Sequence, residues 1–317
     1  MTGFISRREH LAVVGSTNDV VRDWLTAGVP EVCVAVADVQ LAGRGRNGRT
    51  WVAPAGTSLL LSIGTRPAWI APGRAWRVPA TASLAMAEAA EVVAGLAPGT
   101  IRLKWPNDLV VAGEHVAGAR SRWPQATSDR PDVAPVLKLG GVLAESTGLG
   151  GDEPRLVVGL GVNVDWEADA FPADLAASMA SLRLLAGRPV SRDELLATFI
   201  ERLERGLEPL RDDGRFALDE WAVRQLLPGT VVQLEGSGDA DGEWLVVAVD
   251  AEDGALVVAD ATLPGAERRV VAGEAVHVRL AAGRRADHAA MPAGGIPAAP
   301  AAPAAATAPA VTAGGRV

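Results

Sequence analysis

Residues 31–67 read EVCVAVADVQLAGRGRNGRTWVAPAGTSLLLSIGTRP, which is two apolar stretches joined by a loop of glycine and arginine. The runs 31–40 and 58–67 have the composition of buried β-strands. The loop between them, Gly43–Trp51, holds three arginines and three glycines and no acid. Glycine allows close approach of the backbone to a ligand, and guanidinium groups match carboxylate and phosphate oxygens. The loop therefore predicts a site for a ligand that carries several negative charges.

The alternative for this loop is a solvated basic turn that pairs with surface acids, as a single arginine usually does. Three arginines interleaved with glycine directly after a buried strand favour the ligand site. The loop is not a nucleotide fingerprint of the G-x-G-x-x-G or Walker type, because no helical pattern follows it and the lysine–serine ending is missing. Its charges repel one another, so we expect it to be mobile until an anion binds.

Composition narrows the class of protein. The chain has 317 residues and a net charge of −8, which argues against general nucleic-acid binding. No apolar run approaches the roughly 20 residues of a membrane helix, so no membrane partner is expected. Cys33 is the single cysteine, which excludes an intrachain disulfide. Together with the lack of a signal peptide, this predicts a cytoplasmic protein, with Cys33 as a small buried residue of a strand.

Lysine is scarce, because only Lys104 and Lys138 occur among 30 lysines and arginines. A lysine in such a chain marks a position where the planar fork of arginine does not fit. Lys104 stands at the end of a predicted strand, where its compact charge suits a ligand oxygen; the alternative is a snorkelling surface lysine. Asn107, which follows Pro106, could simply be a turn-forming residue. Asp108 could hold the turn, orient Lys104 or bind magnesium.

Polar side chains also gather at Ser16-Thr17-Asn18, before a helical pattern that ends at Gly28. They are expected to cap this helix, and a helix N-terminus with hydroxyl groups also suits the polar head of a ligand. Gln40 adds an amide with donor and acceptor directly before the arginine loop.

The rest of the chain alternates between strand and helix patterns. Helices are expected at 76–96, at 173–186 and at 191–212, the last opened by a capping box of Ser191 and Glu194. Residues 100–118 have the pattern of a β-hairpin, and two further strands are expected at 136–146 and 154–164. These patterns predict an α+β fold.

Three parts follow one another along the chain. Residues 1–224 form the predicted catalytic domain, with a polar, proline-containing insertion loop at about 113–137. Short strands separated by Gly/Asp turns predict a small C-terminal β-barrel domain at 225–282. Residues 283–317 are low-complexity Ala/Pro sequence, which predicts a disordered tail.

The motifs, in this order, resemble those of the biotin protein ligases, which are biotin–acetyl-CoA-carboxylase ligases. The segments are STN at 16–18, QLAGRGRNGRTW at 40–51, KWPNDL at 104–109, KLGGVLAE at 138–145 and GLGVNV at 159–164. The likeness spans roughly residues 10–281. It implies a mixed β-sheet flanked by helices, with the small β-barrel behind it. Too few residues precede Ser16 for a helix-turn-helix, so the resemblance is to the monofunctional type without an N-terminal DNA-binding domain.

The resemblance implies that biotin is held by residues from several motifs: Ser16, Thr17, Asn18, Gln40, Arg44, Gly45, Arg46, Lys104 and Gly141. The first four of these would lie on the ureido end of biotin. The arginine loop would close over the valerate chain and the adenylate phosphate. Gly141 would let the backbone approach the ligand.

For ATP, the resemblance implies contacts from Arg46, Arg49, Trp51 and Asn163. Arg46 and Lys104 would be the catalytic cations that flank the reacting anions. Magnesium would accompany ATP, with Asp108 as a candidate ligand.

The implied reaction is ATP-dependent formation of biotinyl-5′-AMP, followed by transfer of biotin to a lysine of a biotin carrier protein domain of a carboxylase. A lipoate or octanoyl ligase or transferase of similar fold, and a non-catalytic biotin-binding sensor, are the alternatives. The sequence leaves open whether the protein is a monomer or a homodimer. Relative to the family, the insertion between Asp108 and Lys138 leaves the register of that hairpin open.

Overall fold

The computed structural model describes residues 3–112, 136–235, 242–260, 267–271 and 277–285. Of the predicted insertion loop at 113–137, residues 113–135 lie outside this set. The predicted tail at 283–317 lies outside it from residue 286 onward. Among the described residues, no helix is both long enough and apolar enough to span a membrane.

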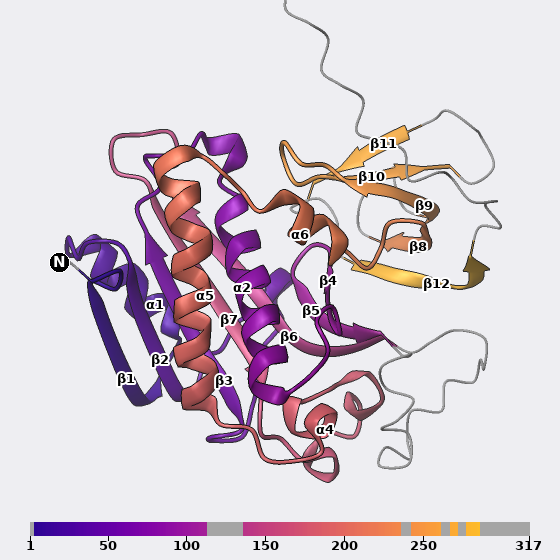
Figure 1. Cartoon of the computed structure of the whole chain (residues 1–317), viewed down its shortest axis with the longest axis horizontal. Coiled ribbons are helices and arrows are strands. Elements are labelled where there is room, and N and C mark those ends of the chain that lie inside the picture. Colours follow the sequence, from indigo (N-terminus) through magenta and orange to yellow (C-terminus); the bar gives the residue numbers. More distant parts are fainter. Residues whose placement is uncertain (1–2, 113–135, 236–241, 261–266, 272–276, 286–317) are drawn as a thin grey trace, which may run out of the picture. The chain divides into compact units, whose positions relative to one another are not determined.

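Within the described residues, a seven-stranded mixed sheet forms the centre of the N-terminal part, in the order β1-β2-β3-β7-β6-β5-β4 (Figure 1). Its strands are β1 (Arg7–Val14), β2 (Cys33–Gln40), β3 (Ser58–Thr65), β4 (Ile101–Lys104), β5 (Asp108–Ala112), β6 (Val136–Thr147) and β7 (Arg155–Asn163). Strands β1 and β2 pair in parallel, and the remaining neighbours pair antiparallel. The expected mixed sheet flanked by helices is therefore confirmed.

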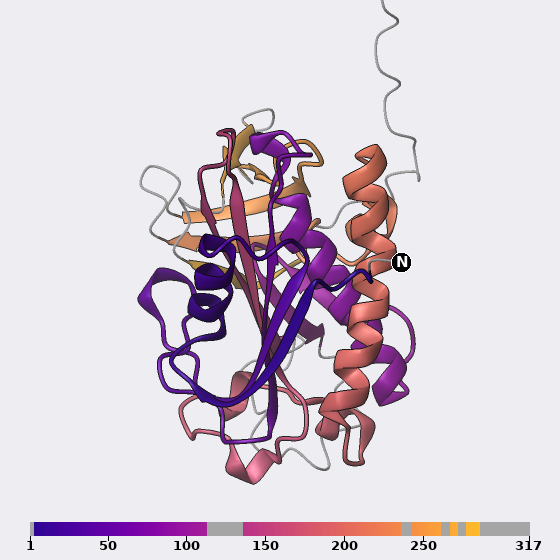
Figure 2. The same cartoon turned by 90° about the vertical axis from the view of Figure 1, so that its left-hand side faces the viewer.

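Helices cover both faces of this sheet (Figure 2). The helices of the described residues are α1 (Thr17–Thr26), α2 (Arg77–Ala94), α4 (Leu182–Ala186), α5 (Arg192–Asp213) and α6 (Leu218–Val223). Helices α2 and α5 lie on one face, and α1 lies on the other. Strand β2 shows why, because alternate residues of a strand point to opposite faces. Val34 and Val36 join the core beneath α2 and α5, whereas Cys33 and Ala35 pack under α1.

Cys33 is a fully buried residue of β2, as its apolar neighbours predict. Burial raises the pKa of the Cys33 thiol to about 11, so the thiolate is disfavoured. This cysteine has a packing role.

Two helix predictions had different outcomes. Helix α5 is confirmed, and the Ser191 side chain accepts a hydrogen bond from the backbone N–H of Glu194, as expected of a cap. The helix expected at 173–186 is wrong before residue 182. The backbone N–H of Ala180 donates instead to the carbonyl of Lys138 at 2.8 Å, so this segment lies along strand β6. A tertiary contact thus overrides the local helical pattern.

A second, five-stranded antiparallel sheet follows in the described residues, in the order β11-β10-β9-β8-β12. Its strands are β8 (Thr230–Glu235), β9 (Gly242–Val249), β10 (Leu256–Ala259), β11 (Glu267–Val270) and β12 (His277–Arg285).

The segment between α6 and β8 runs along β4. The backbone N–H of Leu103 donates to the carbonyl of Arg224, and that of Leu226 donates to the carbonyl of Leu103. The Arg224 guanidinium is bidentate to Glu91 of α2 at 2.8 Å to each oxygen. A buried ion pair therefore joins α2, β4 and the start of the second sheet, directly before Lys104.

The turn between β9 and β10 also contacts the KWPND segment. The indole N–H of Trp105 donates to the carbonyl of Gly254 at 2.9 Å. A Cβ at position 254 would come within 2.8 Å of the Trp76 ring, so this turn requires glycine for its close approach. The second sheet therefore supports the strand end that carries Lys104.

Candidate functional site

One cavity of about 460 Å³ lies at the ends of β2, β4 and β7 and beside the first turn of α1. Every site residue expected from the sequence lines it: Ser16, Thr17, Asn18, Gln40, Arg44, Gly45, Arg46, Arg49, Trp51, Lys104, Asp108, Gly141 and Asn163. These residues come from segments far apart in the chain, so their convergence depends on the fold. The volume is in the usual range for a small-molecule site.

The polar end of the cavity is a chain of hydrogen bonds at the start of α1. The backbone N–H of Thr17 donates to Gln40 Oε1 at 2.8 Å, and the Thr17 hydroxyl lies 3.1 Å from the same oxygen. Ser62 of β3 lies 2.6 Å from Asn18 Oδ1 and 2.7 Å from the Thr17 hydroxyl. The Oε1 atom of Gln40 therefore already accepts hydrogen bonds from the protein. Ser16 occupies the N-cap position as expected, but its side chain makes no capping hydrogen bond.

The arginine loop is a closed hairpin. The backbone N–H of Gly45 donates to the carbonyl of Arg49 at 2.7 Å, and that of Trp51 donates to the carbonyl of Gly43 at 2.9 Å. A Cβ at position 43 would meet the Trp51 carbonyl at 2.5 Å, so only glycine fits there. Whether the loop moves on ligand binding stays a prediction.

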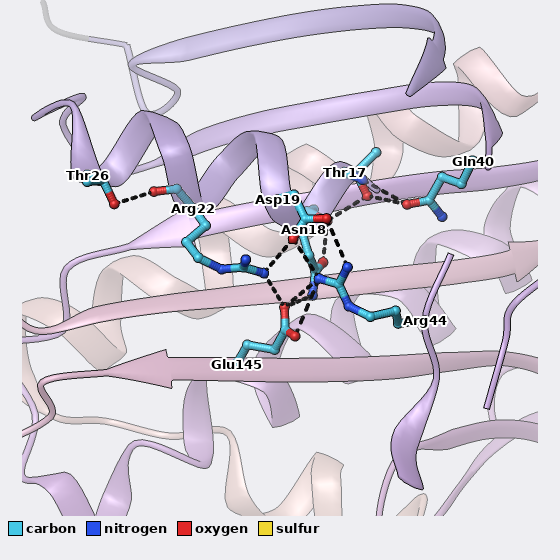
Figure 3. Close-up of polar contacts among 9 residues, drawn as sticks. Thr17, Asn18, Asp19, Arg22, Thr26, Gln40, Arg44 and Glu145 are labelled. Carbon is cyan, nitrogen blue, oxygen red and sulfur yellow. Dashed lines mark hydrogen bonds and ion pairs between the residues drawn. The ribbon is translucent and has the colours of Figure 1, made fainter. Parts of the chain in front are cut away.

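Arg44 agrees with the alternative for this loop, because it pairs with acids of the protein. Its guanidinium is bidentate to Asp19 of α1, at 2.8 and 2.9 Å, and lies 3.3 Å from Glu145 of β6 (Figure 3). The hydrogen bond from Arg44 is the main cause that holds the pKa of Asp19 below its ordinary value. Arg44 is therefore committed to protein carboxylates, although it lines the cavity.

The electrostatic surroundings of Arg46 are the opposite of those of Arg44. The hydrogen bond to Asp19 raises the pKa of Arg44 above its ordinary value. Burial lowers the pKa of Arg46; the charge of Asp108 acts against this, and the charge of Arg49 adds a further, smaller lowering. An arginine stays protonated at neutral pH in both settings. The pKa of Arg46 is thus shifted in the opposite direction to that of Arg44, which has Asp19 and Glu145 as counter-charges.

Trp51 packs against strands β6 and β7 inside the cavity. A Cβ at position 161 would come within 2.7 Å of its indole ring, and one at position 141 would lie 3.6 Å from it. Gly141 and Gly161 are paired across β6 and β7, so the surface beneath the indole ring consists of two neighbouring glycines. Gly141 lines the cavity beside Lys138 and Trp51, and its close approach to the ligand stays a prediction. The indole N–H is buried, and no described residue forms a hydrogen bond with it.

Strands β4 and β5 form the expected hairpin, and they settle the register that the insertion had left open. Lys104 pairs with Asp108 across the hairpin, and Asp108 pairs with Gly141 of β6. The second lysine, Lys138, forms an ion pair with Asp108 at 2.5 Å. Both lysines are therefore placed around one carboxylate.

Asp108 is a poor candidate for a metal ligand. Its carboxylate is occupied by Lys138. In the part of the chain that the structure describes, no group of three His, Cys, Asp or Glu residues could hold a metal ion. These residues do not fit a resident magnesium site.

Asn163 lines the cavity but is 1% exposed. Its amide N–H donates to the carbonyl of Ala180 at 3.0 Å, and its Oδ1 accepts from Ser58 at 3.4 Å. It ties β7 to the segment before α4, which contributes Leu175, Ser178 and Met179 to the cavity wall.

A second cavity, of about 850 Å³, reaches the same arginine loop and Lys104. Its further walls are Trp76, Pro79 and Ala80 of the α2 region, Trp221 of α6 and Gly254 of the β9–β10 turn. The two cavities share the cationic segment as a common wall.

Sequence reasoning missed the carboxylates of the site. Asp19 follows the STN segment directly, and Glu145 ends the KLGGVLAE segment, yet neither was given a role. Arg22 and Ser62 were missed as well, although both contact these segments. The excess of unbalanced arginine was the available signal, because a half-buried guanidinium requires an acceptor.

The fold and the site define a class of proteins that present a cationic loop to a small ligand at the ends of a mixed sheet. Residues 11–128 match the family model described as the biotin/lipoate A/B protein ligase family. The biotin protein ligase of Aquifex aeolicus, solved in complex with biotin and ATP, has the same fold at a TM-score of 0.65 and 22% identity. That likeness covers 87% of this chain and 99% of the Aquifex chain.

Curated relatives agree with this placement. The biotin–[acetyl-CoA-carboxylase] ligase of Mycobacterium tuberculosis is 28% identical over 85% of this chain and 88% of its own length. The bifunctional ligase/repressor BirA of Escherichia coli is 31% identical over 64% of this chain. The match spans about half of the length of BirA, 54%. The chain therefore resembles the biotin/lipoate A/B protein ligase family over residues 11–128 and resembles a biotin–[acetyl-CoA-carboxylase] ligase over most of its length.

Proposed function

We propose that this protein is an ATP-dependent biotin protein ligase, which forms biotinyl-5′-AMP and transfers biotin to a lysine of a carrier domain of biotin-dependent carboxylases. The observation that carries this proposal is the single cavity lined by all the residues that the motifs nominate. The match of residues 11–128 to the family model and the likeness to the mycobacterial relative support it.

In the first step, a carboxylate oxygen of biotin attacks the α-phosphorus of ATP. A C–O–P anhydride bond forms, the bond to the β-phosphate breaks, and pyrophosphate leaves. Two anions must meet in a poorly solvated site, where their repulsion is strong, so cations must flank them. We assign Arg46 and Lys104 to this role, because both side chains line the wall that the two cavities share.

In the second step, the amine of the acceptor lysine attacks the acyl carbon, and AMP leaves with the bonding electrons. We assign the larger cavity to the approach of this lysine, because it reaches the same cationic wall from another direction. The smaller cavity would hold biotin at its hydrogen-bonded end beside Thr17 and the adenylate near Asn163. Trp51 and Arg49 would cover the anhydride and exclude water from it.

The boundary between the two proposed domains is part of the same proposal. Residues 1–224 would be the catalytic domain, and residues 225–282 would close into the small β-barrel. The five-stranded antiparallel sheet of β8 to β12 supports the latter assignment.

The direct test is to incubate the protein with biotin, Mg-ATP and a biotin carrier domain, and to weigh the carrier by mass spectrometry. We expect the mass of one attached biotin, and we expect Arg46→Ala and Lys104→Ala to abolish it on the time scale of the wild type. Arg211→Ala is the matched control, because Arg211 lies near the end of α5 and lines neither cavity.

The same assay separates the alternatives. A carrier that gains lipoate or octanoate in place of biotin would identify the protein as a ligase for those acids. A protein that binds biotin but leaves the carrier unmodified would be a sensor. Labelling that survives both cavity substitutions would refute the assignment of Arg46 and Lys104.

A further inference from the structure

Four charged side chains meet where α1, β6 and the arginine loop come together (Figure 3). Asp19 and Arg22 come from α1, Arg44 from the loop and Glu145 from β6. Arg22 lies 2.7 Å from Asp19 and 3.1 Å from Glu145. Two guanidinium groups and two carboxylates therefore balance one another, and the cluster has no net charge.

Glu145 has contacts on two sides of this cluster. It accepts a hydrogen bond from the side-chain amide of Asn18 at 2.7 Å, and Asn18 belongs to the polar end of the cavity. It also accepts from Arg44 at 3.3 Å, and Arg44 begins the cationic loop. A single carboxylate thus touches both parts of the proposed ligand site.

The charge of Glu145 decides how Asn18 is oriented. An ionised carboxylate only accepts hydrogen bonds, so the NH₂ group of Asn18 must face Glu145. The amide oxygen is then directed to the hydroxyl of Ser62, which lies 2.6 Å away. Asn18 is 4% exposed, and a Cβ at position 159 would collide with its Oδ1, so the glycine at 159 makes room for this buried amide.

The surroundings keep Glu145 in its ionised form. Burial alone would raise the pKa of its carboxyl group, but the hydrogen bond from Asn18 and the charge of Arg44 lower this pKa below its ordinary value overall. The acceptor role of Glu145 therefore holds at neutral pH.

We propose that Glu145 is a positioning residue that couples the polar end of the ligand cavity to the arginine loop, by orienting the Asn18 amide and by holding Arg44 together with Asp19. This inference rests on the proposed function, because it takes biotin as the ligand at the polar end. Arg44 is then the anchor of the loop, and residues 45–51 are the part that responds to the ligand. Neither Asp19 nor Glu145 contacts the reacting atoms in this account.

The test is Glu145→Gln, which keeps the shape of the side chain and removes its charge. The new amide can offer its NH₂ group to Asn18 or to Arg44, which leaves two donors facing each other. We expect the dissociation constant for biotin, measured by titration calorimetry, to rise about tenfold, as for a lost hydrogen bond to a charged group. The KM for ATP and the kcat of adenylate formation should change less than about threefold, because Arg46 and Lys104 are untouched.

The matched control is Asp165→Asn. The side chain of Asp165 is 33% exposed, like that of Glu145, and it is paired with Arg183 at 3.0 Å, but it lines neither cavity. We expect this variant to bind biotin as the wild type does.

A second comparison tests whether Glu145 acts through Asn18. In the background of Asn18→Ala, Glu145→Gln should raise the dissociation constant by a smaller factor than it does in the wild type. Equal factors in both backgrounds would remove Asn18 from the mechanism and overturn the coupling.

The outcomes separate this inference from the function beneath it. Wild-type protein that does not bind biotin overturns the proposed function, and this inference with it. Wild-type protein that binds biotin, together with unchanged affinity in Glu145→Gln, overturns this inference alone. A variant that weakens biotin and ATP equally and melts at a lower temperature would show that Glu145 only supports the fold.

Discussion

Two arginines in this protein bind carboxylates with the same bidentate geometry, one in the buried core and one in a half-exposed position. Arg224 holds Glu91 through two hydrogen bonds of 2.8 Å, with side chains that are 10% and 5% exposed. Arg44 holds Asp19 through hydrogen bonds of 2.8 and 2.9 Å, with side chains that are 35% and 41% exposed. The first pair joins elements of the core, and the second joins a loop to a helix beside a cavity.

The difference shows that hydrogen-bond geometry alone does not reveal the role of an ion pair. A buried pair has no water to replace a lost partner, so removal of one member leaves an uncompensated charge. A half-exposed pair can exchange its partner for water or for another anion at little expense. The first kind of pair therefore supports the fold, and the second kind suits a site whose loop must respond to a ligand.

The largest effect on stability is expected from the buried pair. Glu91→Ala should lower the free energy of unfolding by about 3–5 kcal/mol, because it strands the Arg224 guanidinium beside β4. Denaturant titration measures this value. A loss below about 1 kcal/mol would mean that water reaches Arg224 and that the two pairs are not different in kind.

The largest effect on the reaction rate is expected from Arg46 and Lys104. Arg46→Ala or Lys104→Ala should reduce kcat for biotinyl-5′-AMP formation by about 10²–10³-fold, as the loss of one electrostatic contact to a transition state does. The free energy of unfolding should stay close to that of the wild type. Measured together, a rate loss with intact stability is the reverse of the pattern for Glu91→Ala.

A smaller effect is expected from Arg44→Ala. This substitution removes the loop anchor but no proposed contact to the reacting phosphate, so KM for biotin should rise by about 3–10-fold and kcat should be nearly unchanged. Its effect on unfolding should be about 1 kcal/mol or less, the usual value for an exposed pair. A loss of kcat as large as that of Arg46→Ala would place Arg44 among the catalytic groups.

The smallest effect is a pH dependence of stability. The hydrogen bond from Arg44 is the main cause that lowers the pKa of Asp19 from 3.8. For Glu145, burial acts to raise the pKa, but Asn18 and Arg44 together lower it from 4.5. A carboxyl group with a depressed pKa contributes stability above its unfolded pKa and loses it as the pH falls through the folded pKa. The difference in unfolding free energy between wild type and Asp19→Asn should therefore be constant at neutral pH and shrink below about pH 4. A difference that shrinks on raising the pH would contradict the assignment.

Much of the fold was accessible from local pattern. Helix α2 ends at Gly95, which has φ +69° as a left-handed cap, and α5 begins at the Ser191 cap, because such signals lie within a few residues of the element they delimit. The β4–β5 hairpin was likewise marked by its turn residues. The segment before Ala180 was not predictable, because its backbone bonds to Lys138, more than forty residues earlier in the chain.

The site shows the same limit. The motifs nominated residues that converge on one cavity, because each motif carries its own signature of charge or glycine. The partners of Arg44 could not be found in this way. Glu145 lies 101 residues after Arg44 in the chain. It comes close to the loop because β6 pairs with β7 and α1 packs on the sheet. Nor could the sequence show that Trp51 covers Gly161, because that contact exists only once the loop folds over the sheet.

The most direct measurement is biotin-dependent exchange of labelled pyrophosphate into ATP, compared among wild type, Arg44→Ala and Arg46→Ala. This exchange reports the adenylation step alone and needs no carrier protein. The account predicts exchange in the wild type only when biotin is present, nearly full exchange for Arg44→Ala at saturating biotin, and a loss of about 10²-fold or more for Arg46→Ala. Wild-type exchange that is absent or independent of biotin, or equal losses in the two variants, would contradict it.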